Sequence, residues 1–185
     1  MTLSRNQRLR ALLATAIAGL AVFSAAASAR PADPVVPEKI RVEDGHKPYL
    51  LAHAVGVQIY RCAATPDGPK WRLLAPRADL YGDNGQLVAT HSAGPTWQAR
   101  DGSYVKAQRV DGETVDRTAI QWLLLKATTK AAGADGDRLA GTTFIQRINT
   151  VGGLEPAAAD CDAGAVGSQQ EVPYTADYRF WKEQS

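Results

Sequence analysis

The sequence predicts an all-β fold, a single-domain β-sandwich with long loops and little helix, with a closed β-barrel as the alternative. Stretches rich in β-branched and aromatic residues recur along the chain, about eight to ten in number, with turn signals between them. The dipeptide Asn84-Gly85 stands between two such stretches, which is the pattern of a tight hairpin. We prefer the sandwich because the irregular connections are long for an up-and-down barrel.

Five strands are expected in the first half of the chain. They span residues 39–43, 49–63, 71–74, 78–81 and 86–91, each with alternating or β-forming residues and a turn signal after it. Gly56 interrupts the second strand and indicates a bulge or a bend. Pro76 ends the third, because proline cannot donate a hydrogen bond to a neighbouring strand. The last two strands flank the Asn-Gly turn.

The second half of the chain predicts four more strands, at residues 103–110, 120–126, 142–153 and 172–181. Ile120, Leu123 and Leu124 also fit the apolar stripe of a helix, but the short apolar length and the all-β surroundings favour a strand. Residues 91–103 are rich in turn formers and predict an ordered loop. Residues 155–167 predict an Ala/Gly/Asp-rich connection with one helical turn.

Residues 1–29 have the three regions of a secretory signal peptide. Three arginines precede a charge-free apolar run, and Ala27-Ser28-Ala29 fits a cleavage site. A membrane anchor is the alternative, but the run ends in small residues that are unlike a spanning helix. The predicted organisation is a signal peptide (1–29), an extended proline-containing lead-in (30–38) and one β-domain (39–185), in a periplasmic or secreted protein.

The charge balance offers no general attraction to nucleic acid or to anionic membranes. The whole chain has a formal net charge of +2, from 21 Lys and Arg against 19 Asp and Glu. The predicted signal peptide holds three of the arginines and no acid, so its removal leaves 18 basic residues against 19 acidic ones. A nearly neutral domain of this kind predicts no nucleic-acid partner and no integral membrane segment after cleavage.

The stretch 142–153 is the most informative strand, because neither of its faces is purely apolar. Gln146 falls on one face, whereas Arg147 and Asn149 fall on the other. Polar groups within a sheet need hydrogen-bond partners, so these side chains predict either a structural network or the floor of a site.

Cys62 and Cys161 are the two cysteines of the chain, and in an exported protein two cysteines usually form a disulfide. A catalytic thiol is the alternative, which the oxidising compartment disfavours. His46, His53 and His91 are scattered without any metal-binding spacing, so no cofactor is expected, although a three-histidine copper or zinc site stays open.

No motif identifies an enzyme. The chain has no Gly-x-Ser-x-Gly elbow, no phosphate loop and no dinucleotide fingerprint. Asp101, Glu171 and Asp177 are candidates for a glycosidase pair only if the fold brings them together. Four tryptophans and six tyrosines are able to line a carbohydrate or small-molecule surface, with core packing as the alternative.

If the protein has a ligand site, we expect it where the loop that begins at His91 meets the polar strand. The candidate residues are His91, Trp97 and Asp101 from the loop, Gln146, Arg147 and Asn149 from the strand, and Gln58 and Asp177 beside them. The alternative is structural: Arg147 pairs with an acid such as Asp177, and the amides bond to backbone groups of the loop.

Several segments together resemble a known family. They are residues 53–62, 91–97 with 101–103, 122–125, 143–153 with Cys161-Asp162, and 172–178. In this order they resemble the domain-of-unknown-function family numbered 3455, which is found in exported bacterial and fungal proteins, over about residues 39–181. The resemblance implies an exported single domain. The family has no established activity, so the resemblance implies no mechanism and no catalytic residues.

Two functions remain open from the sequence. The first is a non-catalytic exported β-domain that binds a small ligand, a glycan or an envelope partner. The second is an extracellular hydrolase that acts on a polymer. Two carboxylates, or a histidine and a carboxylate, that converge within hydrogen-bond reach in a cleft would favour the hydrolase. A polar groove with aromatic faces but no such pair would favour binding.

Overall fold

The computed structural model describes residues 34–184; the predicted signal peptide and the start of the lead-in lie outside the described residues. The elements are η1 (Glu38–Ile40), β1 (His46–Ala63), β2 (Lys70–Tyr81), β3 (Leu87–Ser92), β4 (Thr96–Ala99), β5 (Tyr104–Glu113), β6 (Trp122–Ala131), β7 (Phe144–Gly152), η2 (Ala158–Asp160) and β8 (Gln169–Glu183). The prediction of an all-β class is confirmed. Among the described residues, neither helix has the length and hydropathy needed to cross a membrane.

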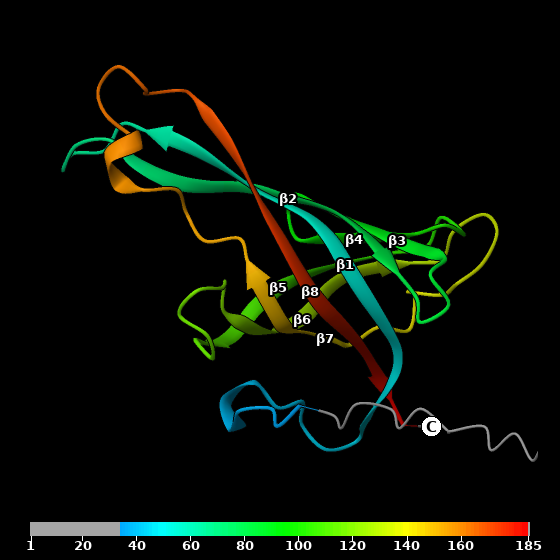
Figure 1. The fold of residues 1–185 in the computed structure, drawn as a ribbon. Coiled ribbons are helices and arrows are strands. Elements are labelled where there is room, and N and C mark those ends of the chain that lie inside the picture. The colour runs from blue at the N-terminus through cyan, green and yellow to red at the C-terminus, as the bar shows by residue number, and fades with distance from the viewer. Residues whose placement is uncertain (1–33, 185) are drawn as a thin grey trace, which may run out of the picture. The chain divides into compact units, whose positions relative to one another are not determined.

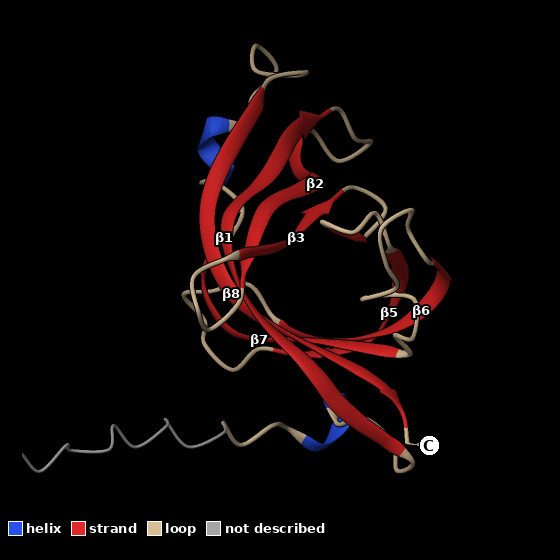
Figure 2. Cartoon of the chain, turned by 90° about the vertical axis from the view of Figure 1, so that its right-hand side faces the viewer, coloured by secondary structure: helices blue, strands red, loops and turns tan. Residues whose placement is uncertain are grey.

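The eight strands form one antiparallel sheet in sequence order, and β8 pairs back with β1. This pairing closes the sheet into a barrel, which Figure 2 shows from one end. Of the two predicted architectures, the strand pairing therefore matches the closed barrel and not a sandwich of two facing sheets. The long connections that suggested a sandwich fit into this barrel because two strands are long. β1 has 18 residues and β8 has 15, so both strands extend beyond their shorter neighbours.

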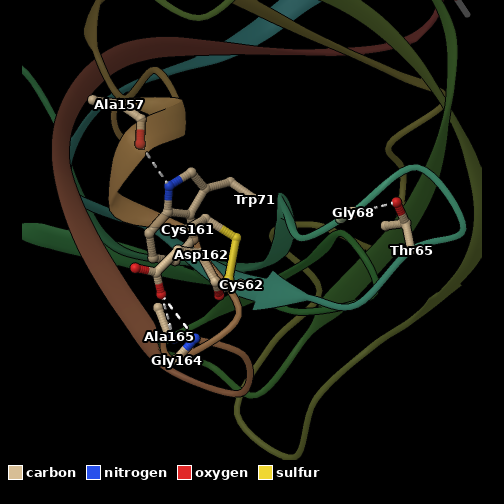
Figure 3. The surroundings of a disulfide bond; sticks show 9 residues. All are labelled: Cys62, Thr65, Gly68, Trp71, Ala157, Cys161, Asp162, Gly164 and Ala165. Carbon is tan, nitrogen blue, oxygen red and sulfur yellow. Dashed lines mark hydrogen bonds between the residues drawn. A yellow bond between two sulfur atoms is a disulfide. The ribbon is translucent and has the colours of Figure 1, made fainter.

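The extended parts of β1, β2 and β8 form a three-stranded arm that leaves the barrel on one side (Figure 1). Figure 3 shows its tip, where a disulfide joins Cys62 to Cys161 with their Cα atoms 5.4 Å apart, as predicted. The Trp71 indole donates to the Ala157 carbonyl at 3.0 Å. The Gly167 amide donates to the backbone carbonyl of Cys62 at 2.8 Å. These bonds fasten the 155–167 connection, which contains the predicted helical turn, to the arm.

Part of the barrel interior is filled by one apolar cluster. Small side chains from six strands line it, namely Ala52, Ala54, Ala78, Ala89, Ala99, Ala107 and Ala176. Larger side chains such as Leu80, Ile145 and Phe180 are fully buried among them. The Leu139 side chain, from the connection between β6 and β7, is also fully buried in this cluster. Small residues allow the walls to approach each other, so this part of the barrel is packed solid.

A second cluster covers the outer face of β6 and β7. Its centre is Ile40, which packs with Trp122, Phe144 and Ile148 and is fully buried. The prediction of a strand at 39–43 is wrong, because these residues form η1 and an extended segment without a strand partner. The alternation that suggested a strand instead reflects Ile40 and Val42 packing onto the barrel.

Two further details differ from expectation. Pro76 lies inside β2 and does not end it; β2 pairs with β3 only from Ala78 onward, so Pro76 has a strand neighbour on one side only, where proline is tolerated. The expected loop at 91–103 contains β4 and forms a hairpin with β3. The strand predicted at 120–126 is confirmed as β6, and the Asn-Gly turn joins β2 to β3 as predicted.

Gln146 joins the outer segment to the barrel. Its Nε2 donates to the Ile40 carbonyl at 2.8 Å, and its Oε1 accepts from the Trp181 indole at 2.9 Å. We expect Gln146→Met, which keeps the volume but leaves both partners without a bond, to lower the free energy of unfolding by about 2 kcal/mol. Chemical denaturation measures this loss. Gln108→Met, at an exposed position of β5, is the control, and an equal effect of both substitutions would contradict the assignment.

Candidate ligand-binding cavity

A cavity of about 500 Å³ lies inside the barrel, where the arm leaves it. Its lining residues come from β1 to β8 and from the adjoining connections. They are Gln58, Tyr60, Leu73, Pro76, His91, Pro95, Trp97, Arg109, Ile120, Gln121, Leu123, Leu125, Arg147, Leu154, Glu155 and Tyr178. The volume falls within the range of small-molecule sites, and most of the wall is apolar.

His91 and Trp97 form one wall of the cavity. They are paired residues of the β3–β4 hairpin, so both side chains point inward and their rings stack at 4.2 Å with an interplanar angle of 7°. The Tyr178 ring contacts both of them edge-on, at 5.2 Å from His91 and 5.5 Å from Trp97. This cluster gives the cavity a rigid aromatic wall.

His91 is neutral in this wall. Its Nδ1 lies 3.0 Å from the Thr96 carbonyl oxygen, an acceptor, so Nδ1 carries the proton and donates. Burial lowers the pKa of His91 to about 4, and the positive charge of Arg147 acts in the same direction. In the neutral ring Nε2 is therefore an acceptor.

We expect this histidine to make the protein sensitive to acid. A folded-state pKa near 4 lies below the ordinary value of 6.5, so between these values the unfolded chain binds the proton more readily and stability falls as pH falls. The loss should reach up to about 3 kcal/mol by pH ~4. His91→Asn keeps an amide donor for Thr96 but does not titrate, so its stability should fall less between pH ~7 and ~4. Denaturation of both proteins across this range measures the difference; parallel curves would contradict the prediction.

Arg147 is the central charge of the cavity. Its Nε and one terminal nitrogen donate to the Gln121 carbonyl at 3.1 and 2.9 Å, which fixes the plane of the guanidinium. It forms no ion pair with a carboxylate in the part of the chain that the structure describes. Burial raises the pKa of the Tyr178 hydroxyl, and the Arg147 charge opposes that rise, as it also does at Tyr60.

Two buried donors in the wall have no hydrogen-bond partner. They are Nε2 of Gln58, whose side chain is 1% exposed, and Nε1 of Trp97, which is fully buried. An unpaired buried polar group costs about 1–3 kcal/mol, so native proteins rarely keep one without a use. Both residues line the same cavity, and neither nitrogen is open to solvent.

The structure brings together four of the eight predicted site residues. Gln58, His91, Trp97 and Arg147 line the cavity, whereas Asp101, Gln146, Asn149 and Asp177 do not. Gln146 faces outward because successive side chains of β7 point to opposite sides of the sheet. Its two bonds are structural, but they go to the Ile40 carbonyl and the Trp181 indole and not to the backbone of the loop at 91–103 that the alternative interpretation named. The pairing of Arg147 with Asp177 that this interpretation also named is wrong, since each has other partners.

Asp101 has a structural environment. Its Oδ1 accepts from the Ser103 amide and hydroxyl at 2.9 and 2.6 Å, and its Oδ2 accepts from the Arg138 amide at 2.9 Å. Ser103 in turn accepts from the Leu139 amide at 3.0 Å. The carboxylate thus ties the β4–β5 turn to the connection that buries Leu139, and these bonds hold its pKa below the usual range.

Asp177 and Asn149 belong to a network on the outer face of the barrel. His53 points outward, since its neighbours in β1 are buried in the interior cluster. Its Nδ1 lies 2.7 Å from Asp177, and its Nε2 lies 3.0 Å from Asp83. Hydrogen bonds to Asp83 and then to Asp177 raise the pKa of His53. Asn149, with a φ of 51°, donates to Asp177 at 2.8 Å beside the irregularity in β7.

The three histidines lie in separate environments. His46 lies edge-on to Phe144 at 5.0 Å, His53 belongs to the outer network, and His91 lines the cavity. Within residues 34–184, no three His, Cys, Asp or Glu side chains are arranged to hold a metal ion. Glu171 of the suggested carboxylate pair lies in an exposed ion pair with Arg77 at 2.6 Å, apart from Asp101 and Asp177.

Sequence reasoning missed Tyr60, Gln121 and Tyr178 as cavity residues. Tyr60 donates to the Gly153 carbonyl at 2.7 Å, and the Tyr178 and Tyr174 hydroxyls lie 3.3 Å apart. The available signal was the alternation of tyrosines on one face of β8, which places several hydroxyls on the inner side of the sheet. Gln121 contributes a backbone carbonyl to Arg147, and no sequence pattern indicates such a role.

The comparisons with known proteins bear on the family and not on the activity. Neither the comparison with curated proteins nor that with solved structures found a match. The family described as "Protein of unknown function (DUF3455)" matches residues 43–182, which include all eight strands in whole or in large part. The match covers most of the chain and agrees with the resemblance of the sequence motifs, so the chain belongs to this family of proteins of unknown function.

Proposed function

We propose that this protein is an exported β-domain that binds a small ligand inside its barrel. The observation that carries the proposal is the cavity of about 500 Å³ with two buried, unpartnered donors in its wall, from Gln58 and Trp97. A mostly apolar cavity with a few convergent polar groups is the usual form of a small-molecule site. A bound molecule would satisfy the two donors and remove the cost of leaving them unpaired.

The cavity suits binding better than hydrolysis. Its histidine is neutral and bonds to a backbone carbonyl, and Glu155, the one carboxylate among the lining residues, is exposed. A histidine and a carboxylate do meet at His53 and Asp177, but this pair lies on the outer face and its histidine is bonded on both ring nitrogens. The aromatic wall and the absence of an acid–base pair among the lining residues therefore support the binding function.

Export is the second part of the proposal. It is supported by the three signal-peptide regions in residues 1–29 and by the Cys62–Cys161 disulfide, a bond that persists in oxidising compartments. N-terminal sequencing of protein from the periplasm or medium should read Arg-Pro-Ala-Asp, from cleavage after Ala29. A cell-bound species that retains Met1 would contradict export.

Native mass spectrometry of the exported protein tests the binding function. We expect a mass excess that disappears on denaturation, together with a small molecule in the denatured sample that is absent from a mock purification. Protein freed of this molecule should melt at a higher temperature when it is added back. Exported protein that carries no excess mass, and whose melting temperature no library of small molecules raises, would contradict ligand binding.

A further inference from the structure

We propose that the ligand is a small amphipathic monocarboxylate whose carboxylate is bound by Arg147, Gln58 and Trp97 and whose apolar body lies against the aliphatic wall. The inference rests on the proposed binding function and specifies the chemical class of the ligand. It is carried by the charge, the hydrogen-bonding groups and the exposure of the cavity residues.

The charge of the cavity favours one negative group. Arg147 has no carboxylate partner in the described part of the chain. Its bonds to the Gln121 carbonyl use two of its five N–H groups, and the Tyr178 hydroxyl is a further partner. A planar guanidinium matches the two oxygens of a carboxylate. The other cation, Arg109, is exposed and bonded to the Gln121 side chain at 3.0 Å. One inner cation therefore matches a monoanion better than a dianionic phosphate.

The unpaired groups require an acceptor in the ligand. The Trp97 indole nitrogen is a donor only, and the Gln58 Nε2 is also a donor. Neither can be satisfied by an ammonium group, which has no lone pair to accept a hydrogen bond. A carboxylate has two oxygens with about four acceptor positions, enough for a guanidinium and two further donors.

The rest of the wall favours an apolar body. Ile120, Leu123 and Leu125 line the cavity inside the barrel. Leu73 and Leu154 also line it but are 54% and 42% exposed, so they mark its mouth. Because the unpaired donors are almost fully buried, the carboxylate lies inward and the apolar body extends toward these leucines. A sugar would leave many hydroxyls without partners against such a wall.

Titration calorimetry with three ligands of equal chain length tests the inference. The protein is the exported, disulfide-intact form freed of co-purified molecules, and the probes are decanoate, decanol and decylamine below their aggregation concentrations. We expect decanoate to bind at least tenfold more tightly than decanol, and decylamine to bind more weakly than both. Tryptophan fluorescence of the wild type should change on decanoate binding, because Trp97 lines the cavity, and this change should be lost in Trp97→Phe.

Substitutions separate the head group from the apolar body. Arg147→Met should reduce decanoate affinity to that of decanol while leaving decanol affinity within about twofold of wild type. Arg72→Met, an exposed arginine of β2 outside the cavity, is the matched control and should change neither affinity. Gln58→Leu should weaken decanoate binding less than Arg147→Met does, and it keeps the test available if Arg147→Met fails to fold.

The outcomes distinguish this inference from the proposed function. Equal affinities for decanoate and decanol, or tighter binding of decylamine, would overturn the carboxylate assignment while leaving a binding cavity in place. A preference for decanoate that survives both Arg147→Met and Gln58→Leu would overturn the assigned residues. If none of the three probes binds although the co-purified molecule does, the ligand class is wrong and the binding function stands.

Discussion

Removal of the disulfide, by the double substitution Cys62→Ala with Cys161→Ala, is expected to lower the free energy of unfolding by about 4–5 kcal/mol. The bond closes a loop with a sequence separation of 99 residues, and opening it restores that conformational freedom to the unfolded chain. For a domain of this size the loss corresponds to a fall in melting temperature of roughly 10–20 °C. Thermal and chemical denaturation of the variant and of the disulfide-intact protein measure it.

The effect should be largest in the connection that the disulfide holds. Residues 155–167 bury little apolar surface, and apart from the disulfide they are held by a few hydrogen bonds such as that of Trp71 to Ala157 (Figure 3). We expect limited proteolysis of the double variant to cut this segment first. Because Leu154 and Glu155 line the cavity at the start of the segment, ligand should also leave the variant faster.

Reduced wild-type protein is the control for the disulfide. It should unfold at nearly the same temperature as the double variant, because both lack the same bond. A double variant as stable as oxidised wild type, or two alkylatable thiols in folded wild-type protein purified without reductant, would contradict the prediction.

Gly56→Ala is expected to destabilise the protein by about 3 kcal/mol or more. A Cβ at this position would lie 2.5 Å from Cα of the paired residue Ala78 and even closer to the Arg77 carbonyl oxygen. Both obstacles are backbone atoms of β2, so the two strands must separate at the point where they leave the barrel. The glycine therefore permits a close approach of two strands; it does not mark the bulge that was expected, since β1 is irregular at Pro48/Leu50 and Ile59/Tyr60 instead.

The matched control is Gly141→Ala, where an added Cβ meets nothing within 4 Å. We expect this variant to unfold within about 0.5 kcal/mol of wild type. Chemical denaturation compares the two proteins. A Gly56→Ala protein that is as stable as Gly141→Ala would show that the strands accommodate a methyl group there.

The sequence by itself determined the all-β class, most strand positions, the Asn-Gly hairpin and the disulfide. These features depend on local information: alternation, turn chemistry and a pair of cysteines that follow a predicted signal peptide. It also identified four residues of the cavity. Gln58 and Arg147 stand out as polar side chains within strands, and His91 and Trp97 stand out within a stretch rich in turn residues. Local patterns failed at residues 39–43, where an alternating segment packs on the barrel without pairing.

Only the tertiary structure decided which polar residues share a site. Gln146 and Arg147 are neighbours in sequence, yet one anchors the outer segment and the other enters the cavity, because each has partners from distant strands. Closure of the sheet depends on pairing between β1 and β8, whose partners lie more than a hundred residues apart, as His53 and Asp177 do. Likewise, a donor such as the Trp97 indole is known to be unpaired only when every group around it has been placed. Long-range pairing fixes these relations, and a strand's own sequence does not record its partner.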